Sequence, residues 1–164
     1  MKTLLLLRHA KSSWKDTSVK DFDRPLNQRG LKAAPAIGRL MRKRKLQPEL
    51  VLSSPAERAR QTTQLVLEAA GLKTEVRYDE RIYEASAARL FEIVSQIDEE
   101  AGMVMMVGHN PGFEELLEAL SGEARSLSTA ALACIELDIE RWSKVRAGEN
   151  QLAWLVRPKE LKSA

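Results

Sequence analysis

Short apolar runs alternate with amphipathic stretches along the chain. Strands are predicted at residues 3–7, 49–52, 74–78 and 103–107, and the first of these runs is continuously apolar, as in a parallel strand covered on both faces. Two further strands are predicted at 131–139, whose end alternates apolar and acidic residues as if one face were wet, and at 151–156 as its partner. This order predicts an α/β fold, a single-domain three-layer α/β/α sandwich with a mostly parallel central sheet over residues 1–164.

Helical spacing of apolar residues predicts four helices between these strands. The first begins near Asn27 and carries an apolar stripe that includes Ile37 and Met41, although Pro35 is expected to kink or divide it. The third spans residues 86–99 and turns Leu90, Ile93, Val94 and Ile97 inward. Both helices are therefore expected to pack against the sheet.

Cap signals delimit the second and fourth helices. The second is predicted to open at Ser54 as N-cap, with Pro55 at its first position, Glu57 three residues after the cap and Gly71 at its end. The fourth is predicted to start directly after His109, with Asn110 as cap, Pro111 at its first position and Gly122 at its end. Each helix would begin where a strand ends, and its N-terminus would present free N–H groups to an anion.

Composition excludes several classes of protein. The longest apolar runs have about five residues, too few to cross a bilayer, and residues 1–3 lead into a strand, so we expect a soluble, cytoplasmic protein with no membrane contact. Cys134 is the single cysteine, which excludes an internal disulfide and argues against a cysteine metal site. A net charge of +3 does not demand nucleic acid, and the basic run 39–45 is interpreted as a solvated helix end rather than an RNA or acidic-protein contact.

The two histidines stand where predicted strands end. His9 follows the first strand and His109 follows the fourth, so both are expected at the edge formed by the carboxyl ends of the parallel strands. Arg8 directly precedes the first histidine, and Arg58 lies near the start of the second helix. Two imidazoles and two guanidiniums, without a cysteine or carboxylate cluster, indicate a pocket for an anion, most simply phosphate.

Three other interpretations compete with a catalytic phosphate pocket. A strand-end histidine is usually capped or half-buried, and Arg8 would be equally satisfied by a structural ion pair with an acidic residue. A non-catalytic phosphate-binding module would keep the arginines without needing His9. A metal protein is disfavoured because two histidines supply too few ligands and no carboxylate motif completes the set.

The catalytic interpretation assigns a reaction to these residues. If Arg8, Arg58 and His109 surround a phosphoryl group, His9 remains as the group that attacks phosphorus, with one ring nitrogen unprotonated and the other held by a hydrogen bond. The product is a covalent phosphohistidine. Arginines would stabilise the charge of the transition state, so neither a metal nor another cofactor is expected.

Three segments resemble the signature segments of the histidine phosphatase superfamily, which includes the phosphoglycerate mutases: Leu7–Ser12, Ser54–Thr62 and Val107–Pro111. The short length and the segment Asp21–Gly30 are most similar to the small SixA-type phosphohistidine phosphatases, and the resemblance covers essentially the whole chain. It implies that His9 is the phosphorylated nucleophile, that Arg8 and Arg58 clamp the phosphoryl oxygens, and that His109 completes the pocket.

The resemblance also bears on the proton donor and the substrate. Larger relatives use a glutamate from a later loop, for which Glu80 is the nearest match, with an ordinary solvated or ion-paired glutamate as the alternative. Ala10 and Lys15 depart from the glycine and asparagine common in mutases, which weighs against mutase activity. The segment 78–86 is too short for a large lid, so we expect a phosphohistidine-bearing protein as substrate, for which bacterial histidine relay proteins are the family-level candidates. A small phosphorylated metabolite is the second possibility.

Overall fold

Six strands form one mixed sheet in the computed structural model, which describes residues 1–161. The strand order is β3-β2-β4-β1-β5-β6. Their bounds are β1 Lys2–Arg8, β2 Leu50–Ser53, β3 Glu75–Tyr78, β4 Met103–Gly108, β5 Leu132–Leu137 and β6 Gln151–Val156. The pairs β3–β2, β2–β4 and β4–β1 are parallel, whereas β5 is antiparallel to both β1 and β6. The mostly parallel sheet is therefore confirmed, with an antiparallel pair added at one side.

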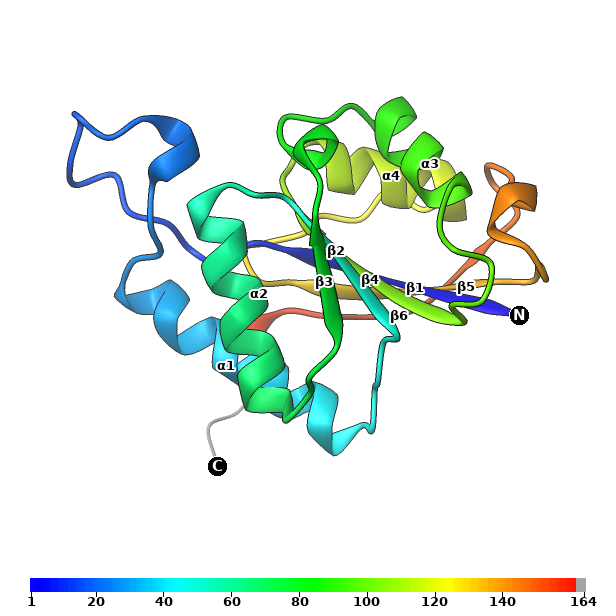
Figure 1. Cartoon of the computed structure of the whole chain (residues 1–164), viewed down its shortest axis with the longest axis horizontal. Helices are drawn as coiled ribbons and strands as arrows, with labels where there is room; N and C mark the ends of the chain where they lie inside the picture. The colour runs from blue at the N-terminus through cyan, green and yellow to red at the C-terminus, as the bar shows by residue number, and fades with distance from the viewer. Residues whose placement is uncertain (162–164) are drawn as a thin grey trace.

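Two pairs of helices cover opposite faces of this sheet, which confirms the three-layer sandwich (Figure 1). Helices α1 (Gln28–Lys43) and α2 (Glu57–Ala70) pack together on one face, and α3 (Ala87–Ser95) and α4 (Gly112–Ser121) on the other. Short 3₁₀ helices lie in the connections: η1 Asp21–Asp23, η2 Glu80–Ile82, η3 Trp142–Lys144 and η4 Pro158–Glu160. Within residues 1–161, no helix is both long enough and apolar enough to span a bilayer.

The continuous leucine run of β1 is explained by the helices that cover both faces of the sheet. Leu4 and Leu6 pack into the core beneath α3 and α4, whereas Leu5 and Leu7 pack into the core beneath α1 and α2, and all four are fully buried. Each buried leucine contributes roughly 1.5–3 kcal/mol relative to an exposed one. An alternating pattern would have left one face of this central strand polar.

The first helix is continuous through its proline. Helix α1 begins beside Asn27, as predicted, and Asn27 caps it by accepting a hydrogen bond from the Gly30 N–H. Of the two outcomes expected at Pro35, a kink or a division, the division is wrong. Proline removes the N–H that would bond the carbonyl of Leu31, and Leu31 lies on the exposed side, where water can satisfy that carbonyl. The predicted ends of α2 and α4 are confirmed, because Gly71 and Gly122 both adopt the left-handed conformation that ends these helices.

Three helix boundaries differ from the sequence prediction. Helix α2 has Ala56 as its N-cap rather than Ser54, and α4 has Pro111 rather than Asn110. The Asn110 amide instead donates to the carbonyl of Leu127. The third helix ends at Ser95, four residues before the predicted end. Polar side chains at a strand end have tertiary partners available that cap rules do not consider, such as the Leu127 carbonyl for Asn110.

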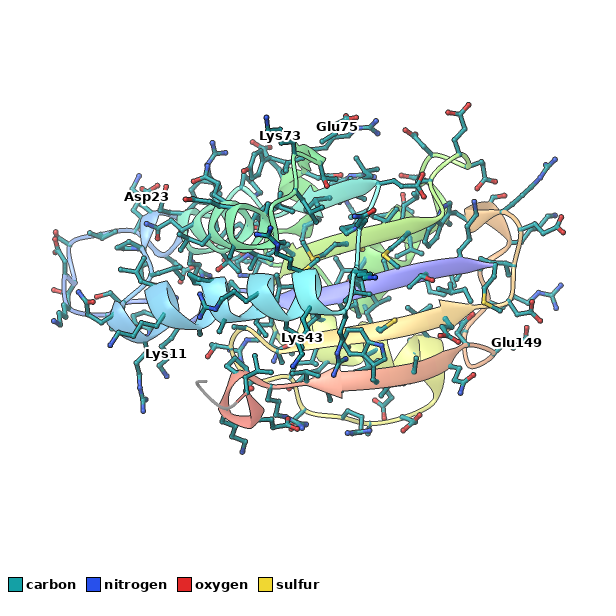
Figure 2. The ribbon with its side chains drawn as sticks, turned by 90° about the horizontal axis from the view of Figure 1, so that it is seen from below. Lys11, Asp23, Lys43, Lys73, Glu75 and Glu149 are labelled. Atoms are coloured by element: carbon teal, nitrogen blue, oxygen red, sulfur yellow. The ribbon has the colours of Figure 1, made fainter. Side chains whose placement is uncertain are left out.

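Adjacent parallel strands place several polar residues at one edge of the sheet. Strands β2, β4 and β1 are neighbours, and their paired positions end at Ser53, Val107, Arg8 and Gly108. The segment 9–27, between β1 and α1, extends beyond this edge (Figure 1). Figure 2 shows Lys11 and Asp23 at that end of the molecule and Glu149 at the opposite end. The strand ends and this segment together enclose the candidate site.

Candidate active site

The carboxyl ends of the parallel strands and the segment 9–27 form a pocket of about 220 Å³. Four cationic side chains, two histidines and four other residues line it: Arg8, Lys11, Arg24, Arg58, His9, His109, Ser12, Trp14, Asn110 and Thr129. Among residues 1–161, no carboxylate side chain lines this pocket. The structure thus brings together four of the five residues singled out in the sequence, in surroundings suited to an anion.

His9 is held in the orientation that a nucleophile requires. Its Nδ1 lies 2.7 Å from the backbone carbonyl oxygen of Ala10, and because that oxygen can only accept, Nδ1 carries the hydrogen and Nε2 keeps its lone pair. Burial lowers the pKa of His9 to about 3, with the nearby charges of Arg58 and Arg8 acting in the same direction against the hydrogen bond to Ala10. The imidazole is therefore neutral at neutral pH, with its Nε2 lone pair unoccupied by a proton.

His109 lies beside His9, with a distance of 5.1 Å between the ring centroids. Its Nε2 is 2.7 Å from the Ser54 hydroxyl oxygen, which also accepts the backbone N–H of Ala56 at 3.2 Å. Ser54 is fully buried, and His109 Nε2 is the acceptor that its hydroxyl hydrogen finds among residues 1–161. A buried donor left without an acceptor costs about 1–3 kcal/mol, so Ser54 donates to Nε2.

This hydrogen bond fixes the tautomer of the neutral His109 ring. With Nε2 accepting, the hydrogen of the neutral ring is on Nδ1, which is buried and has no hydrogen-bond partner within the described chain. Burial, followed by the charge of Arg58, lowers the pKa of His109 to about 4. The pocket thus contains one imidazole with a free lone pair and one with a free N–H that can donate to an anion.

The two arginines differ in their present partners. Arg8 donates from Nη1 to the carbonyl of Leu127 at 2.9 Å, and within residues 1–161 no carboxylate forms an ion pair with it, contrary to the structural ion-pair interpretation. Arg58 donates from Nη1 to the carbonyl oxygen of Asp21 at 2.7 Å and from Nη2 to its carboxylate at 3.1 Å. The Nε of each guanidinium is buried without a partner in the described part of the chain. Both side chains therefore have donors left for an anion.

Asp21 is a member of the site that sequence reasoning did not single out. Its carboxylate accepts from Arg58, from Arg24 at 3.1 Å and from the Tyr83 hydroxyl at 2.6 Å. Burial alone would raise its pKa, but the Tyr83 hydrogen bond and the two arginines outweigh that effect and lower it to about 2. Asp21 is consequently ionised at neutral pH and ties the segment 9–27 to helix α2 and to the segment after β3.

Glu80 is the predicted site residue that the structure does not bring to the pocket. It begins η2, is exposed, and lines two separate surface hollows together with Arg81. Tyr83, three residues further, reaches the site instead, with its ring centroid 5.5 Å from that of His109. Glu80 and Tyr83 line the same surface hollow beside the 3₁₀ turn Glu80–Ile82, but of the two it is Tyr83 that also reaches Asp21 and His109, a detail that the sequence pattern does not encode.

Comparison with known proteins agrees with this geometry. Residues 4–102 match the family model of the Histidine phosphatase superfamily (branch 1). The chain belongs to this superfamily. An uncharacterized chloroplastic protein of Arabidopsis thaliana is 31% identical over 160 residues, which cover 92% of this chain and 73% of that protein.

SixA proteins are similar to this superfamily member over their full length. The SixA protein of Agrobacterium tumefaciens is 32% identical with a TM-score of 0.83, covering 96% of this chain and 98% of its own. The protein histidine phosphatase SixA in complex with tungstate shares the fold, with a TM-score of 0.85 at 22% identity and coverage of 98% and 99%. The chain is therefore a phosphatase of SixA-like structure, as the resemblance of its motifs implied.

Two other residues at the candidate site, Arg24 and Thr62, were missed in the sequence. Arg24 is 6% exposed and donates to the Ser12 hydroxyl at 2.6 Å, and Thr62 accepts the backbone N–H of Ala10 at 2.9 Å. Both lie in segments that resemble the superfamily, but neither follows a strand and neither forms part of a periodic pattern. Over residues 1–161, no three histidine, cysteine or acidic side chains gather as a metal site would require.

Proposed function

We propose that this phosphatase removes phosphate from phosphohistidine on another protein through a covalent intermediate on His9. The observation that carries the proposal is the Nδ1–H bond from His9 to the Ala10 carbonyl, which leaves Nε2 unprotonated inside a pocket lined by arginines. Arg8 and Arg58 hold the equatorial oxygens of the phosphoryl group, and the free Nδ1–H of His109 donates to one of them.

The first step transfers the phosphoryl group to the enzyme. The lone pair of His9 Nε2 forms a bond to phosphorus, while the bond from phosphorus to the substrate nitrogen breaks and its electron pair stays with the leaving imidazole. When the other ring nitrogen of the substrate is protonated, the leaving group is neutral imidazole and needs no acid from the enzyme. Water then attacks the phosphorus of phospho-His9, releasing inorganic phosphate and restoring the lone pair on Nε2.

The absence of a suitable acid in the lining supports a nitrogen leaving group. An alkoxide leaving from a phosphate ester needs protonation in the transition state, whereas imidazole does not. Asp21, whose carboxylate binds Arg58 of the pocket, has a pKa of about 2 and is held by two arginines and Tyr83, so it is a poor proton donor at neutral pH. Glu80 does not line the pocket, and a role as donor would require it to move.

The size of the pocket also supports a protein substrate. Sites that enclose drug-sized ligands have volumes of roughly 300–1,000 Å³, whereas this pocket has about 220 Å³. It can enclose a phosphoryl group and part of a leaving group, and the rest of a substrate must lie outside. A phosphohistidine at the surface of another protein meets that condition, and the SixA-like structure agrees with it.

Rapid acid-free quenching of a reaction with ³²P-labelled phosphohistidine protein tests the intermediate. We expect acid-labile, base-stable label on His9, and His9→Ala is expected to abolish it. Label on a serine or on Cys134, or normal turnover by His9→Ala, would refute the nucleophile assignment.

A substrate panel with excess EDTA tests the substrate class and the role of the arginines. Hydrolysis is expected to persist in EDTA and to stop with vanadate, because Arg8 and Arg58 supply the positive charge. Phosphohistidine proteins should be hydrolysed faster than phosphoserine peptides. Faster hydrolysis of small phosphate esters than of every phosphohistidine protein would instead identify a metabolite phosphatase, and activity restored only by Mg²⁺ would refute the metal-free mechanism.

A further inference from the structure

Trp14 is a large apolar side chain left in solvent at the rim of the pocket. It is 70% exposed, yet it belongs to the same pocket lining as His9 and Arg58. The guanidinium carbon of Arg24 lies 3.4 Å from the centroid of its ring, so the cation covers one face of the indole. The exposed fraction of the side chain leaves the remainder of the ring available for contact.

Arg24, which supports this indole, is itself held in place by hydrogen bonds. It is buried, and its Nη1 donates to the Ser12 hydroxyl at 2.6 Å and to the Ser13 carbonyl at 3.3 Å, while its Nε donates to Asp21 at 3.1 Å. Asp21 is in turn bonded to Arg58 of the pocket. The orientation of the indole is thus set by the same network that surrounds the phosphoryl site, which lowers the entropy that a contact on Trp14 must overcome.

The remainder of the rim agrees with a surface that contacts a polypeptide. Lys11 lines the same pocket as Trp14. Outside that lining, but in the same segment 9–27, Phe22 is 38% exposed and packs edge-on against Tyr83 at a centroid distance of 5.1 Å. Aromatic side chains and arginine, which Trp14, Phe22 and Arg24 supply here, are the residue types enriched where proteins bind proteins. The pocket itself is too small to enclose more than the phosphorylated group, so the neighbouring part of the substrate must meet this rim.

We propose that the exposed face of Trp14 binds the polypeptide that carries the phosphohistidine, contacting residues next to the phosphorylated side chain. The indole then determines specificity for protein over small-molecule substrates, and Arg24 holds it in place. This inference rests on the proposed function, because it presumes that a protein phosphohistidine enters the pocket.

Comparison of two substrates with the same scissile bond tests the proposal. One is free phosphohistidine, and the other is a protein phosphorylated on histidine with phosphoramidate. For Trp14→Ala we expect kcat/KM on the protein to fall about tenfold more than kcat/KM on free phosphohistidine, mainly through KM, as expected for loss of an aromatic contact. Trp14→Phe, which keeps a flat aromatic face, is expected to recover most of the difference.

A matched control is available at another aromatic residue stacked by an arginine. Tyr78 is 36% exposed beneath Arg60, at 4.3 Å, and does not line the pocket. Tyr78→Ala should leave the ratio between the two substrates unchanged. Equal losses on both substrates in Trp14→Ala, or no recovery in Trp14→Phe, would overturn the proposal. If the wild-type enzyme hydrolyses free phosphohistidine but no phosphohistidine protein, the proposed function fails, whatever Trp14 does.

Discussion

Replacement of Arg58 by lysine separates the geometry of the phosphate clamp from its charge. Arg58 already donates two hydrogen bonds to Asp21 and holds a buried Nε with no partner in the described chain. Lysine keeps the charge but has a single ammonium group, which cannot hold Asp21 and also present a two-pronged contact to a phosphoryl group. Arg58→Lys is therefore expected to lose one or more contacts that form in the transition state.

The expected loss follows from the number of contacts. Removing one preorganised donor from such a site costs on the order of 2–4 kcal/mol, which corresponds to a roughly 30- to 1000-fold decrease in kcat/KM. Steady-state hydrolysis and the inhibition constant of vanadate should both be measured, since vanadate binding is expected to weaken with the rate. Folding should change little, because the charge pairing with Asp21 can persist.

A control variant lies two residues further along the same helix. Arg60 stacks over Tyr78 outside the pocket, so Arg60→Lys should leave turnover and vanadate inhibition near the wild-type values. If Arg58→Lys behaves like Arg60→Lys, Arg58 is an ordinary helix residue and the clamp is wrong.

Three further predictions follow from the hydrogen bonds, pKa values and packing. Ser54→Ala removes the donor to His109 Nε2 and should lower kcat/KM, whereas Ser54→Thr, which keeps a hydroxyl, should recover much of the lost kcat/KM. A ¹⁵N NMR spectrum of the wild-type protein that finds the His109 hydrogen on Nε2 would contradict the assignment. His9 and His109 have pKa values of about 3 and 4 in the folded protein, so as the pH falls below about 6.5 the histidines of the unfolded chain bind protons before those of the folded chain. The free energy of unfolding should therefore fall by about 2 kcal/mol between pH 7 and 5.5, and a variant with both histidines replaced by glutamine should lose that pH dependence. Gly38→Ala would drive a Cβ into the backbone of α2 and should cost about 1–3 kcal/mol in urea unfolding, whereas Gly102→Ala, whose Cβ meets only a flexible glutamate carboxylate at 3.1 Å, should cost less.

The core strands illustrate what could be predicted from local pattern. The run from Leu4 to Leu7 indicates a strand buried on both faces because every position is apolar, and the structure confirms it. Gly71 and Gly122 mark helix ends because glycine adopts the left-handed conformation without a Cβ penalty. In these cases the sequence signal lies within a few neighbouring residues, although the packing that buries Leu4–Leu7 comes from distant segments.

Ser54 and Glu80 illustrate where local pattern is insufficient. Ser54 has the sequence of an N-cap, yet its hydroxyl bonds the ring of His109, which is 55 residues away. Glu80 has the sequence of a loop acid, yet the turn that it begins leaves it outside the pocket lining and places the Tyr83 ring 5.5 Å from that of His109. A polar side chain has several partners of similar energy, and which of them lies within hydrogen-bond distance depends on the packed chain.

The sequence alone determined the layered α/β architecture and the meeting of His9 and His109 at one edge of the sheet. Both follow from apolar runs and from the rule that parallel strands end at the same side. Only the tertiary structure decided which nitrogens are free to react, how Asp21 engages the arginines, and which residues form the rim. Those properties depend on contacts between segments far apart in the chain and on burial that lowers the pKa values of both histidines, so no local pattern encodes them.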